Sequence, residues 1–199
     1  MNELTGLYDG THLSITGMRG SPYVAISGKP GWQQARYQAG NAHGPIVEGK
    51  YTARIVIDSG GAQFKRRLDD DALTCKLEPS YSIQEIRVTK QHLDRKPGQT
   101  NLRIIDCADA AAAWGQYRWR LVPDAKTQQT IAGYKRSGGF HLHGGGTASL
   151  GTSGCIRVGD TFWSDLRALI ERHAKTLRTL NLTVRYPSRE TLTGPVGAR

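Results

Sequence analysis

The chain reads Phe140-His141-Leu142-His143-Gly144-Gly145-Gly146 and, a few residues later, Gly151-Thr152-Ser153-Gly154-Cys155-Ile156-Arg157. In the first run, Phe140 and Leu142 alternate with His141 and His143, which is the period of a half-buried β-strand. The two imidazoles are therefore expected to face the same cleft. The second run carries a cysteine within a glycine-rich segment. Together the two runs predict a strand that presents histidines beside a loop that presents a thiol.

Alternation of apolar and polar residues recurs in three other segments, each of which is expected to be a half-buried strand. Their apolar positions are Leu13 and Ile15; Tyr51, Ala53, Ile55 and Ile57; and Leu180, Leu182, Val184 and Tyr186. One amphipathic helix is expected after the cysteine, with Asp160 as its cap. Its apolar stripe consists of Phe162, Leu166, Leu169, Ile170, His173 and Leu177. Alternating strands with one sizeable helix indicate a mainly β protein, either a β-sandwich or a barrel.

Cys155 and His143 are the candidate catalytic pair. A thiol of ordinary pKa, about 8.5, is mostly protonated at neutral pH, so a neighbouring imidazole is needed to generate the nucleophilic thiolate. Gly154 is expected to let the backbone approach the substrate, because a side chain there would obstruct it. The backbone amides from Ser153 to Cys155 are expected to bind the oxygen of a tetrahedral intermediate. The pattern predicts acyl transfer by a cysteine enzyme.

Arg157 is the main candidate for substrate binding. It lies two residues after Cys155, so on an extended segment both side chains project to one face, where a guanidinium suits a substrate carboxylate. Thr152, Gly144 and His141 are further candidates around the substrate. His141 is expected to assist from the histidine-bearing face of its strand, the alternative being a surface residue without a role.

These motifs resemble the catalytic domain of the L,D-transpeptidases, whose pattern is His-Gly, a variable loop and then Ser/Thr-x-Gly-Cys. The resemblance implies the L,D-transpeptidase fold, with the histidine strand and the cysteine loop beside one groove. It also implies a reaction on peptidoglycan stem tetrapeptides through an acyl-enzyme on Cys155. Water as acceptor gives an L,D-carboxypeptidase, a free D-amino acid gives an exchange reaction, and another stem gives a cross-link.

The segment from histidine to cysteine is shorter than in most cell-wall transpeptidases, and in this respect the chain is similar to the transpeptidase-like toxins that type VI secretion systems deliver into rival bacteria. Three upstream segments resemble the same toxins: Ala25-Ile26-Ser27-Gly28, Gly44-Pro45-Ile46-Val47-Glu48-Gly49-Lys50-Tyr51 and Trp114-Gly115-Gln116-Tyr117-Arg118. The resemblance spans roughly residues 4 to 170. It implies an antibacterial effector that trims or exchanges stem termini, a secretion-system carrier, and a cognate immunity protein that covers Arg157. The cell-wall enzymes often carry a further His or Lys before Gly-Cys, where this chain has Ser153.

No export signal is expected at the N-terminus, because Glu3 stands there and no basic segment is followed by an apolar one. No apolar stretch approaches the roughly 20 residues of a membrane span. We therefore expect synthesis in the cytoplasm without a signal peptide, delivery by a type VI system, and action in the target-cell periplasm without membrane insertion.

The net charge of +10 implies attraction to polyanions such as nucleic acid, anionic lipid or acidic cell-wall polymer. Nucleic acid is not expected as a partner, because the basic residues are scattered, apart from Lys65-Arg66-Arg67, and no nucleic-acid motif is present.

The length of the chain fits a single domain over residues 1–186, and 24 glycines suit a loop-rich β protein. Residues 187–199 are rich in Pro, Ser, Thr and Gly and are expected to form a flexible tail. Residues 59–112 fit no motif and are interpreted as a family-specific insertion. With Cys155 as the nucleophile, Cys75 and Cys107 are left either to pair in an oxidising compartment or to stay free.

Two alternatives to the cysteine enzyme stay open. A zinc-dependent amidase or peptidase would use His141, His143 and His173, although no acidic metal-site motif accompanies them. A noncatalytic module would bind anionic cell-wall polymer through the +10 charge, with Cys155 as a core residue. The favoured cysteine mechanism needs neither a metal nor a cofactor.

Overall fold

The computed structural model describes residues 2–39, 43–55, 57–58, 61–62, 83–85, 114–115, 117–144, 152–173 and 176–193. The expected insertion at 59–112 lies almost entirely outside the described residues, and so do Cys75 and Cys107. Both alternatives for these two cysteines, a disulfide or two free thiols, therefore stay predictions.

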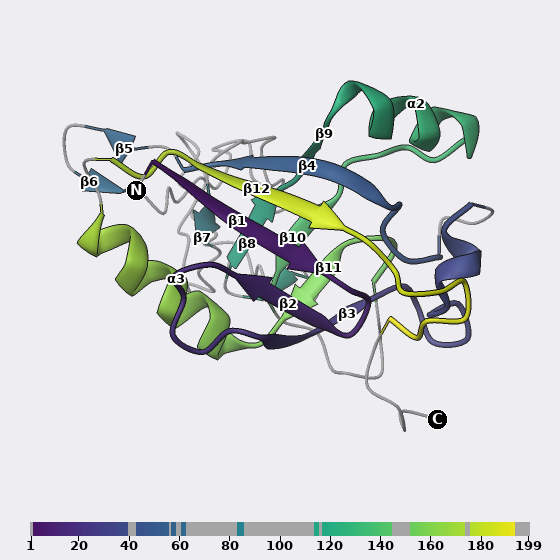
Figure 1. Cartoon of the computed structure of the whole chain (residues 1–199), viewed down its shortest axis with the longest axis horizontal. Coiled ribbons are helices and arrows are strands. Elements are labelled where there is room, and N and C mark those ends of the chain that lie inside the picture. The colour runs from purple at the N-terminus through teal and green to yellow at the C-terminus, as the bar shows by residue number, and fades with distance from the viewer. Residues whose placement is uncertain are drawn as a thin grey trace, which may run out of the picture.

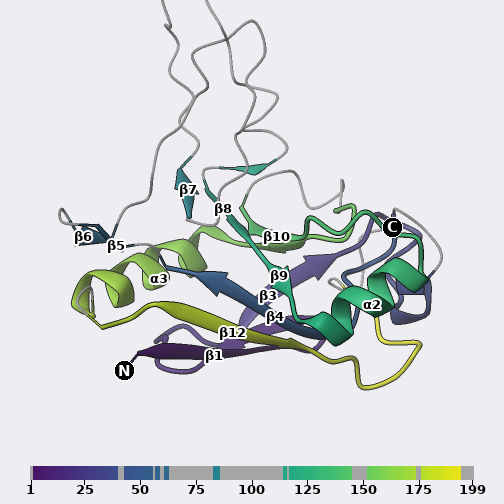
Figure 2. The ribbon, with the colours of Figure 1, turned by 90° about the horizontal axis from the view of Figure 1, so that it is seen from above.

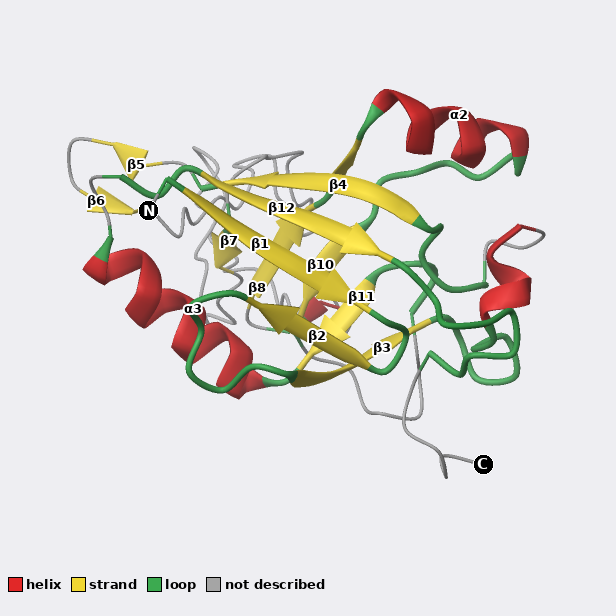
Figure 3. Cartoon of the chain, in the orientation of Figure 1, coloured by secondary structure: helices red, strands yellow, loops and turns green. Residues whose placement is uncertain are grey.

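The described part of the chain is mainly β, as the sequence predicts (Figure 3). The strands are β1 (Glu3–Tyr8), β2 (His12–Ile15), β3 (Tyr23–Ser27), β4 (Gly49–Arg54), β5 (Ile57–Asp58), β6 (Gly61–Ala62), β7 (Gln84–Glu85), β8 (Tyr117–Arg120), β9 (Val122–Pro123), β10 (His141–His143), β11 (Ile156–Val158) and β12 (Thr179–Val184). The helices are α2 (Ala125–Gly133), α3 (Asp160–Arg172) and the short 3-10 helix η1 (Ala35–Ala39). The predicted helix after the cysteine is α3, whereas α2 was not predicted.

Ten strands form one sheet in the order β7-β8-β10-β11-β3-β2-β1-β12-β4-β9. Two neighbouring pairs are parallel, β1 with β12 and β10 with β11, and the other pairs are antiparallel. Only Leu121 separates β8 from β9, although these strands lie near opposite ends of the sheet order. One continuous segment thus joins both ends, and the sheet nearly closes into a barrel (Figures 1 and 2). This arrangement selects the barrel over the open sandwich.

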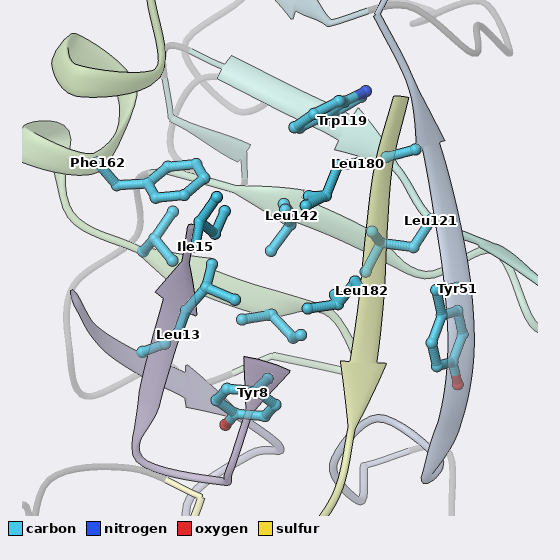
Figure 4. Packing of buried hydrophobic residues seen from close by; sticks show 14 of the residues in the cluster. Tyr8, Leu13, Ile15, Tyr51, Trp119, Leu121, Leu142, Phe162, Leu180 and Leu182 are labelled. Atoms are coloured by element: carbon cyan, nitrogen blue, oxygen red, sulfur yellow. The ribbon is translucent and has the colours of Figure 1, made fainter. Parts of the chain in front are cut away.

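The hydrophobic core fills the space between two walls of the barrel. Figure 2 shows β1, β12 and β4 on one side of the molecule and β8 and β10 on the other. In Figure 4, Trp119 and Leu142 of the second wall point toward Leu180 and Leu182 of the first, with Phe162 of α3 beside them. Each of these five side chains is at most 1% exposed. Leu142, Leu180 and Leu182, which alternate with polar residues in the sequence, are therefore inward positions of their strands. The strand that was predicted to reach Ile57 ends at Arg54, and Ile57 belongs to the separate strand β5.

The helix α3 differs in its ends from the prediction. Its N-cap is Gly159, which makes no side-chain cap, and Asp160 lies in the first turn, where its charge favours the helix dipole. The helix ends at Arg172 with His173 as the C-cap, so Leu177 is buried beyond the helix rather than on its stripe. Phe162, Leu166, Leu169 and Ile170 are buried as predicted, and Trp163 joins them.

The beginning of the segment that was expected to be a tail, up to Thr193, makes long-range hydrogen bonds. The side chain of Thr193 is fully buried, and its hydroxyl donates hydrogen bonds to the carbonyl oxygens of Ser27 and Gln33. The Thr193 amide also donates to Gln33 O at 2.7 Å. Turn-forming composition predicted fraying, but these long-range hydrogen bonds bring the segment back to the end of β3. In the part of the chain that the structure describes, no helix has the length and apolar character needed to cross a membrane.

Candidate active site

The parallel pairing of β10 with β11 brings the two sequence motifs together. Leu142 pairs with Ile156, and His143 pairs with Arg157. Leu142 and Ile156 are both fully buried in the core. Paired residues share a face and successive residues alternate, so His143 and Arg157 lie on the opposite, outward face of this wall. Continuing the register by one residue places Cys155 opposite His141 on that same outward face.

Cys155 is a buried free thiol, 9% exposed. Burial raises its pKa to about 11, because the thiolate loses contact with water. Three features oppose that rise: a hydrogen bond from the backbone of His141 and the charges of Arg136 and Arg118. The resting thiol is therefore protonated at neutral pH, and these three features only partly offset the effect of burial.

His143 is held in the tautomer that a general base needs. Its Nδ1 lies 2.7 Å from the carbonyl oxygen of Gly144. A carbonyl only accepts, so Nδ1 carries the proton and the lone pair of the neutral ring is on Nε2. Burial lowers the pKa of His143 to about 4, the Gly144 bond opposes this, and the charge of Arg157 lowers it further. The imidazole is thus neutral and able to accept a proton at neutral pH.

His141 and His143 flank one indole, that of Trp114. The ring centroid of Trp114 lies 5.1 Å from that of His141 and 5.3 Å from that of His143, in edge-to-face arrangements. The guanidinium carbon of Arg118 lies 5.1 Å from the same indole. Both imidazoles thus face one side of the strand, as the sequence predicts. The backbone of His141 also makes a hydrogen bond to the thiol of Cys155, and the role of its side chain stays a prediction.

The outward face around the thiol is strongly cationic. Arg118 and Arg120 of β8 pair with His143 and His141, and Arg157 lies on β11. Burial lowers the pKa of Arg118 to about 10, which leaves it charged at neutral pH, and that of His141 to about 4. A face with this charge suits a ligand that carries carboxylates.

Thr152 fastens the cysteine loop to the end of β3. Its hydroxyl donates to the carbonyl oxygen of Cys155 at 2.5 Å and accepts from the amide of Gly28 at 3.1 Å. Its own amide donates to Gly28 O at 3.0 Å. The Thr152 side chain is buried, and these hydrogen bonds support the loop. Its contact with substrate stays a prediction.

Gly154 has a different reason for being glycine from the one predicted. Its φ is +96°, a conformation that L side chains rarely adopt. A Cβ at this position would lie 2.2 Å from Nη2 of Arg136 and 2.7 Å from Cε1 of Phe140. The space beside Gly154 is therefore occupied by the protein itself.

Gly144 lies against a buried indole. A Cβ at Gly144 would lie 3.1 Å from Nε1 of Trp163. That nitrogen is buried and makes no hydrogen bond to any described residue. Gly144 is thus expected to orient the His143 ring through its carbonyl rather than to bind substrate directly.

The amides predicted to bind an oxyanion lie in the loop that ends at Cys155. Ser153 is exposed, whereas Gly154 and Cys155 are buried. Within the described residues, no hydrogen bond engages the backbone N–H groups of Ser153, Gly154 and Cys155. The geometry is compatible with donation of these N–H groups to a bound ligand.

Sequence reasoning missed three residues of the site, namely Trp114, Arg118 and Arg136. Trp114 and Arg118 fall inside a segment singled out for its resemblance, but no single residue there suggested contact with the histidines. Arg136 follows α2 and had no motif to mark it. No local sequence pattern would have found these contacts, because strand pairing and the end of a helix bring the residues together.

The third histidine of the zinc alternative lies elsewhere. His173 is the C-cap of α3, whereas His141 and His143 belong to β10. In the described ranges, no group of three or more His, Cys, Asp or Glu residues is arranged to hold a metal ion.

A cavity of about 350 Å³ lies apart from the candidate site. Lys50, Thr127 and Arg185 are among the residues of β4, α2 and the end of β12 that line it. None of the predicted catalytic residues belongs to its lining. We place the candidate active site at the β10–β11 face because that face carries both the candidate nucleophile and the candidate base.

The chain was compared with models of known protein families and with curated proteins, and neither comparison gave a match.

Proposed function

We propose that the chain is a cysteine acyltransferase of the L,D-transpeptidase type that acts on peptidoglycan stem tetrapeptides. The observation that carries this proposal is the β10–β11 pairing, which sets His143, Cys155 and Arg157 on one outward face. The barrel-like sheet and the helix α3 after the cysteine are compatible with the L,D-transpeptidase fold that the sequence motifs suggest.

In the proposed reaction, the Cys155 sulfur attacks the carbonyl carbon between the third and fourth residues of the stem. Its proton passes to Nε2 of His143, which the Gly144 hydrogen bond leaves as the unprotonated nitrogen. The oxyanion is bound by backbone N–H groups of the loop from Ser153 to Cys155. Collapse of the tetrahedral intermediate breaks the C–N bond, and His143 returns the proton to the departing D-alanine. A thioester on Cys155 results.

Attack of an acceptor on the thioester completes the cycle. Water would release a tripeptide, a D-amino acid would give an exchanged stem, and the side-chain amine of another stem would give a cross-link. Arg157 is the proposed anchor for a substrate carboxylate, since it shares the face of the thiol and the charge of a bound carboxylate would complement it.

We also propose the biological setting that the motifs suggest. A type VI effector would reach the periplasm of a rival cell, where trimming or exchange removes the donors for cross-linking. The +10 charge would concentrate such a protein on an acidic wall. A cognate immunity protein would protect the producer by covering the face around Arg157.

The test is incubation of the purified protein with disaccharide tetrapeptide, with and without D-methionine, followed by product masses. We expect loss of the terminal alanine or its replacement by methionine, and neither change with Cys155→Ala. Arg185→Ala, an exposed change at the far end of β12, is the matched control and should act like the wild type. An unaltered tetrapeptide, with sacculus binding unchanged in Cys155→Ala, would favour the noncatalytic wall-binding module instead.

A further inference from the structure

Arg136 is placed by the way in which helix α2 ends. Tyr134 is the C-cap, and Lys135 adopts a left-handed φ of 54°. The amide of Lys135 donates to Ala132 O at 2.9 Å, and the amide of Arg136 donates to Ile131 O at 3.1 Å. This pair of bonds is the Schellman motif, which fixes the direction of the chain after a helix. The buried Ile131 anchors the helix to the core, so the position of Arg136 is set by the core of the barrel.

The guanidinium of Arg136 holds the segment that leads into β4. Its Nη1 donates to the carbonyl oxygens of Pro45 and Gln38, and its Nη2 donates to that of Gly44 at 3.2 Å. Its central carbon lies 5.1 Å from the centroid of the Phe140 ring. These acceptors are neutral carbonyls, so they orient the cation without neutralising it.

The same guanidinium lies against the loop that carries the thiol. The Cβ position of Gly154 lies 2.2 Å from Nη2 of Arg136, so the arginine occupies the space that any side chain at 154 would need. The loop is clamped on its other side by Thr152, which bonds Gly28 and Cys155. Cys155 is thus attached to a segment held between β3 and Arg136.

Arg136 acts on Cys155 through its charge as well as through its position. Burial lowers the pKa of Arg136, and among the interactions that oppose this is its attraction to Cys155. Other charged or titratable groups surround the same loop: Arg118 of β8, His141 and His143 of β10, Arg157 of β11, and Tyr51 and Tyr186 next to Arg136. Arg118 approaches from the outward face with Trp114, whereas Arg136 approaches from the side of Phe140.

We propose that Arg136 is a positioning residue for the nucleophile, which fixes the Gly154-Cys155 segment and stabilises the Cys155 thiolate through its charge. This inference rests on the proposed role of Cys155 as nucleophile. Its step is the ionisation of the thiol: the S–H bond breaks, the proton goes to solvent or to His143, and the negative charge on sulfur is stabilised by the guanidinium.

The experiment measures how fast Cys155 is alkylated by iodoacetamide between pH 6 and pH 10. Peptide mass spectrometry assigns the product to Cys155, because Cys75 and Cys107 are also present in the chain. Arg136→Met removes the charge, Arg136→Lys keeps it, and Arg185→Met removes a charge at an exposed position. Circular dichroism verifies that each variant is folded.

We expect Arg136→Met to shift the alkylation profile upward by about one pH unit, so that the rate at pH 8 falls about tenfold. Arg136→Lys should stay within about threefold of the wild type, and Arg185→Met should match it. A folded Arg136→Met variant with the wild-type profile would overturn the proposal. If Arg136→Met does not fold, Arg136→Gln takes its place, because it also removes the charge, and a folded Arg136→Gln variant with the wild-type profile would overturn the proposal.

Alkylation needs no peptidoglycan, so this test is separate from the test of the proposed function. An enzyme that leaves tetrapeptide unaltered but shows the Arg136 effect would contradict the substrate and keep the positioning role. Turnover of tetrapeptide with an alkylation profile unaffected by Arg136→Met would support the proposed substrate and overturn the positioning role.

Discussion

Inward and outward side chains alternate along the strands of both walls of the barrel, but the outward faces of the two walls carry different residues. On β12, inward Leu180 and Leu182 alternate with Asn181, which is exposed and bonds the side chain of Glu3 at 2.9 Å. On β10 and β11, inward Leu142 and Ile156 alternate with outward positions that are themselves largely buried, such as His143 at 4% exposure. The inward sets build the same core. Burial of polar side chains on an outward face is what distinguishes the wall of the proposed active site from the opposite wall.

The largest contrast between the walls is expected in activity. His143→Ala should lower kcat on tetrapeptide by about 10²- to 10⁴-fold, because the proton acceptor for Cys155 is lost. Asn181→Ala on the opposite wall should leave kcat unchanged and alter the free energy of unfolding by no more than about 0.5 kcal/mol. Product analysis and urea denaturation of both variants make the comparison. A His143→Ala enzyme with wild-type kcat would remove His143 from the mechanism.

The buried outward face also predicts an unusual thiol. With the pKa of Cys155 raised to about 11 by burial and that of His143 lowered to about 4, the resting pair is neutral at pH 7. The thiolate fraction, and with it the rate of alkylation at Cys155, should rise about tenfold per pH unit from pH 7 to pH 10. A plateau of the alkylation rate beginning near pH 6 would instead reveal a preformed thiolate–imidazolium pair and would contradict a neutral resting pair.

Three glycines sharpen the comparison by separating crowding from backbone strain. Gly154 has φ +96° and a crowded Cβ position, Gly138 has φ +68° with no atom within 4 Å, and Gly133 lies in α2 with neither feature. We expect Gly154→Ala to destabilise the fold by more than about 2 kcal/mol and Gly138→Ala by about 1 kcal/mol. Gly133→Ala should stabilise by about 0.5–1 kcal/mol, through helix propensity.

Urea unfolding of the three variants measures the series. Equal effects at Gly154 and Gly138 would mean that Arg136 and Phe140 move aside at little cost. The positive φ alone, and not the crowded Cβ position, would then explain why residue 154 is a glycine.

Much of the fold could be predicted because its strands have one buried and one outward face. Leu13, Ile15, Leu180 and Leu182 alternate with polar residues, and a period of two is a strong local signal. The closure of the sheet could not be predicted, since it depends on the short strand β9 continuing β8 and pairing with β4. The helix α2 was also missed, because only Thr127 and Ile131 are buried along it and its apolar stripe is weak.

The candidate site was predictable where its residues are close in sequence and not where they are distant. His143, Cys155 and Arg157 were placed by motif and by alternation along a strand. Trp114, Arg118 and Arg136 reach the site through strand pairing and a helix end, which no local pattern encodes. The contacts that Gly154 and Thr152 make with Arg136 and Gly28 could not be predicted for the same reason, since these partners come from distant segments.

The outward face should make the fold sensitive to acid. Burial lowers the pKa of both His141 and His143 to about 4, below the ordinary value near 6.5. Between these values the unfolded chain binds more protons than the folded one, so the free energy of unfolding rises with pH through this window and falls on acidification. We expect a loss on the order of 1–2 kcal/mol per imidazole from pH 7 to pH 5.

Thermal unfolding between pH 5 and pH 7 measures this dependence. The slope should be reduced in His143→Asn, which has no group to protonate, whereas Asn181→Ala on the opposite wall should keep the wild-type slope. An identical slope in His143→Asn would contradict the assignment of the effect to this histidine.

The smallest effect is expected where the helix α2 ends and the position of Arg136 is set. Lys135 adopts a left-handed φ of 54°, a conformation that costs a non-glycine residue about 1 kcal/mol and glycine very little. Lys135→Gly should therefore raise the free energy of unfolding by a few tenths to about 1 kcal/mol, with the gain partly offset by the greater freedom of glycine in the unfolded chain.

Urea denaturation measures the gain in the free energy of unfolding. Lys126→Gly, at the exposed start of the same helix, is the matched control and should destabilise the fold. Because the Schellman bonds are unchanged by glycine, alkylation of Cys155 in Lys135→Gly should match the wild type. Equal destabilisation by the two substitutions would mean that the left-handed residue is not what sets the direction of the chain toward Arg136.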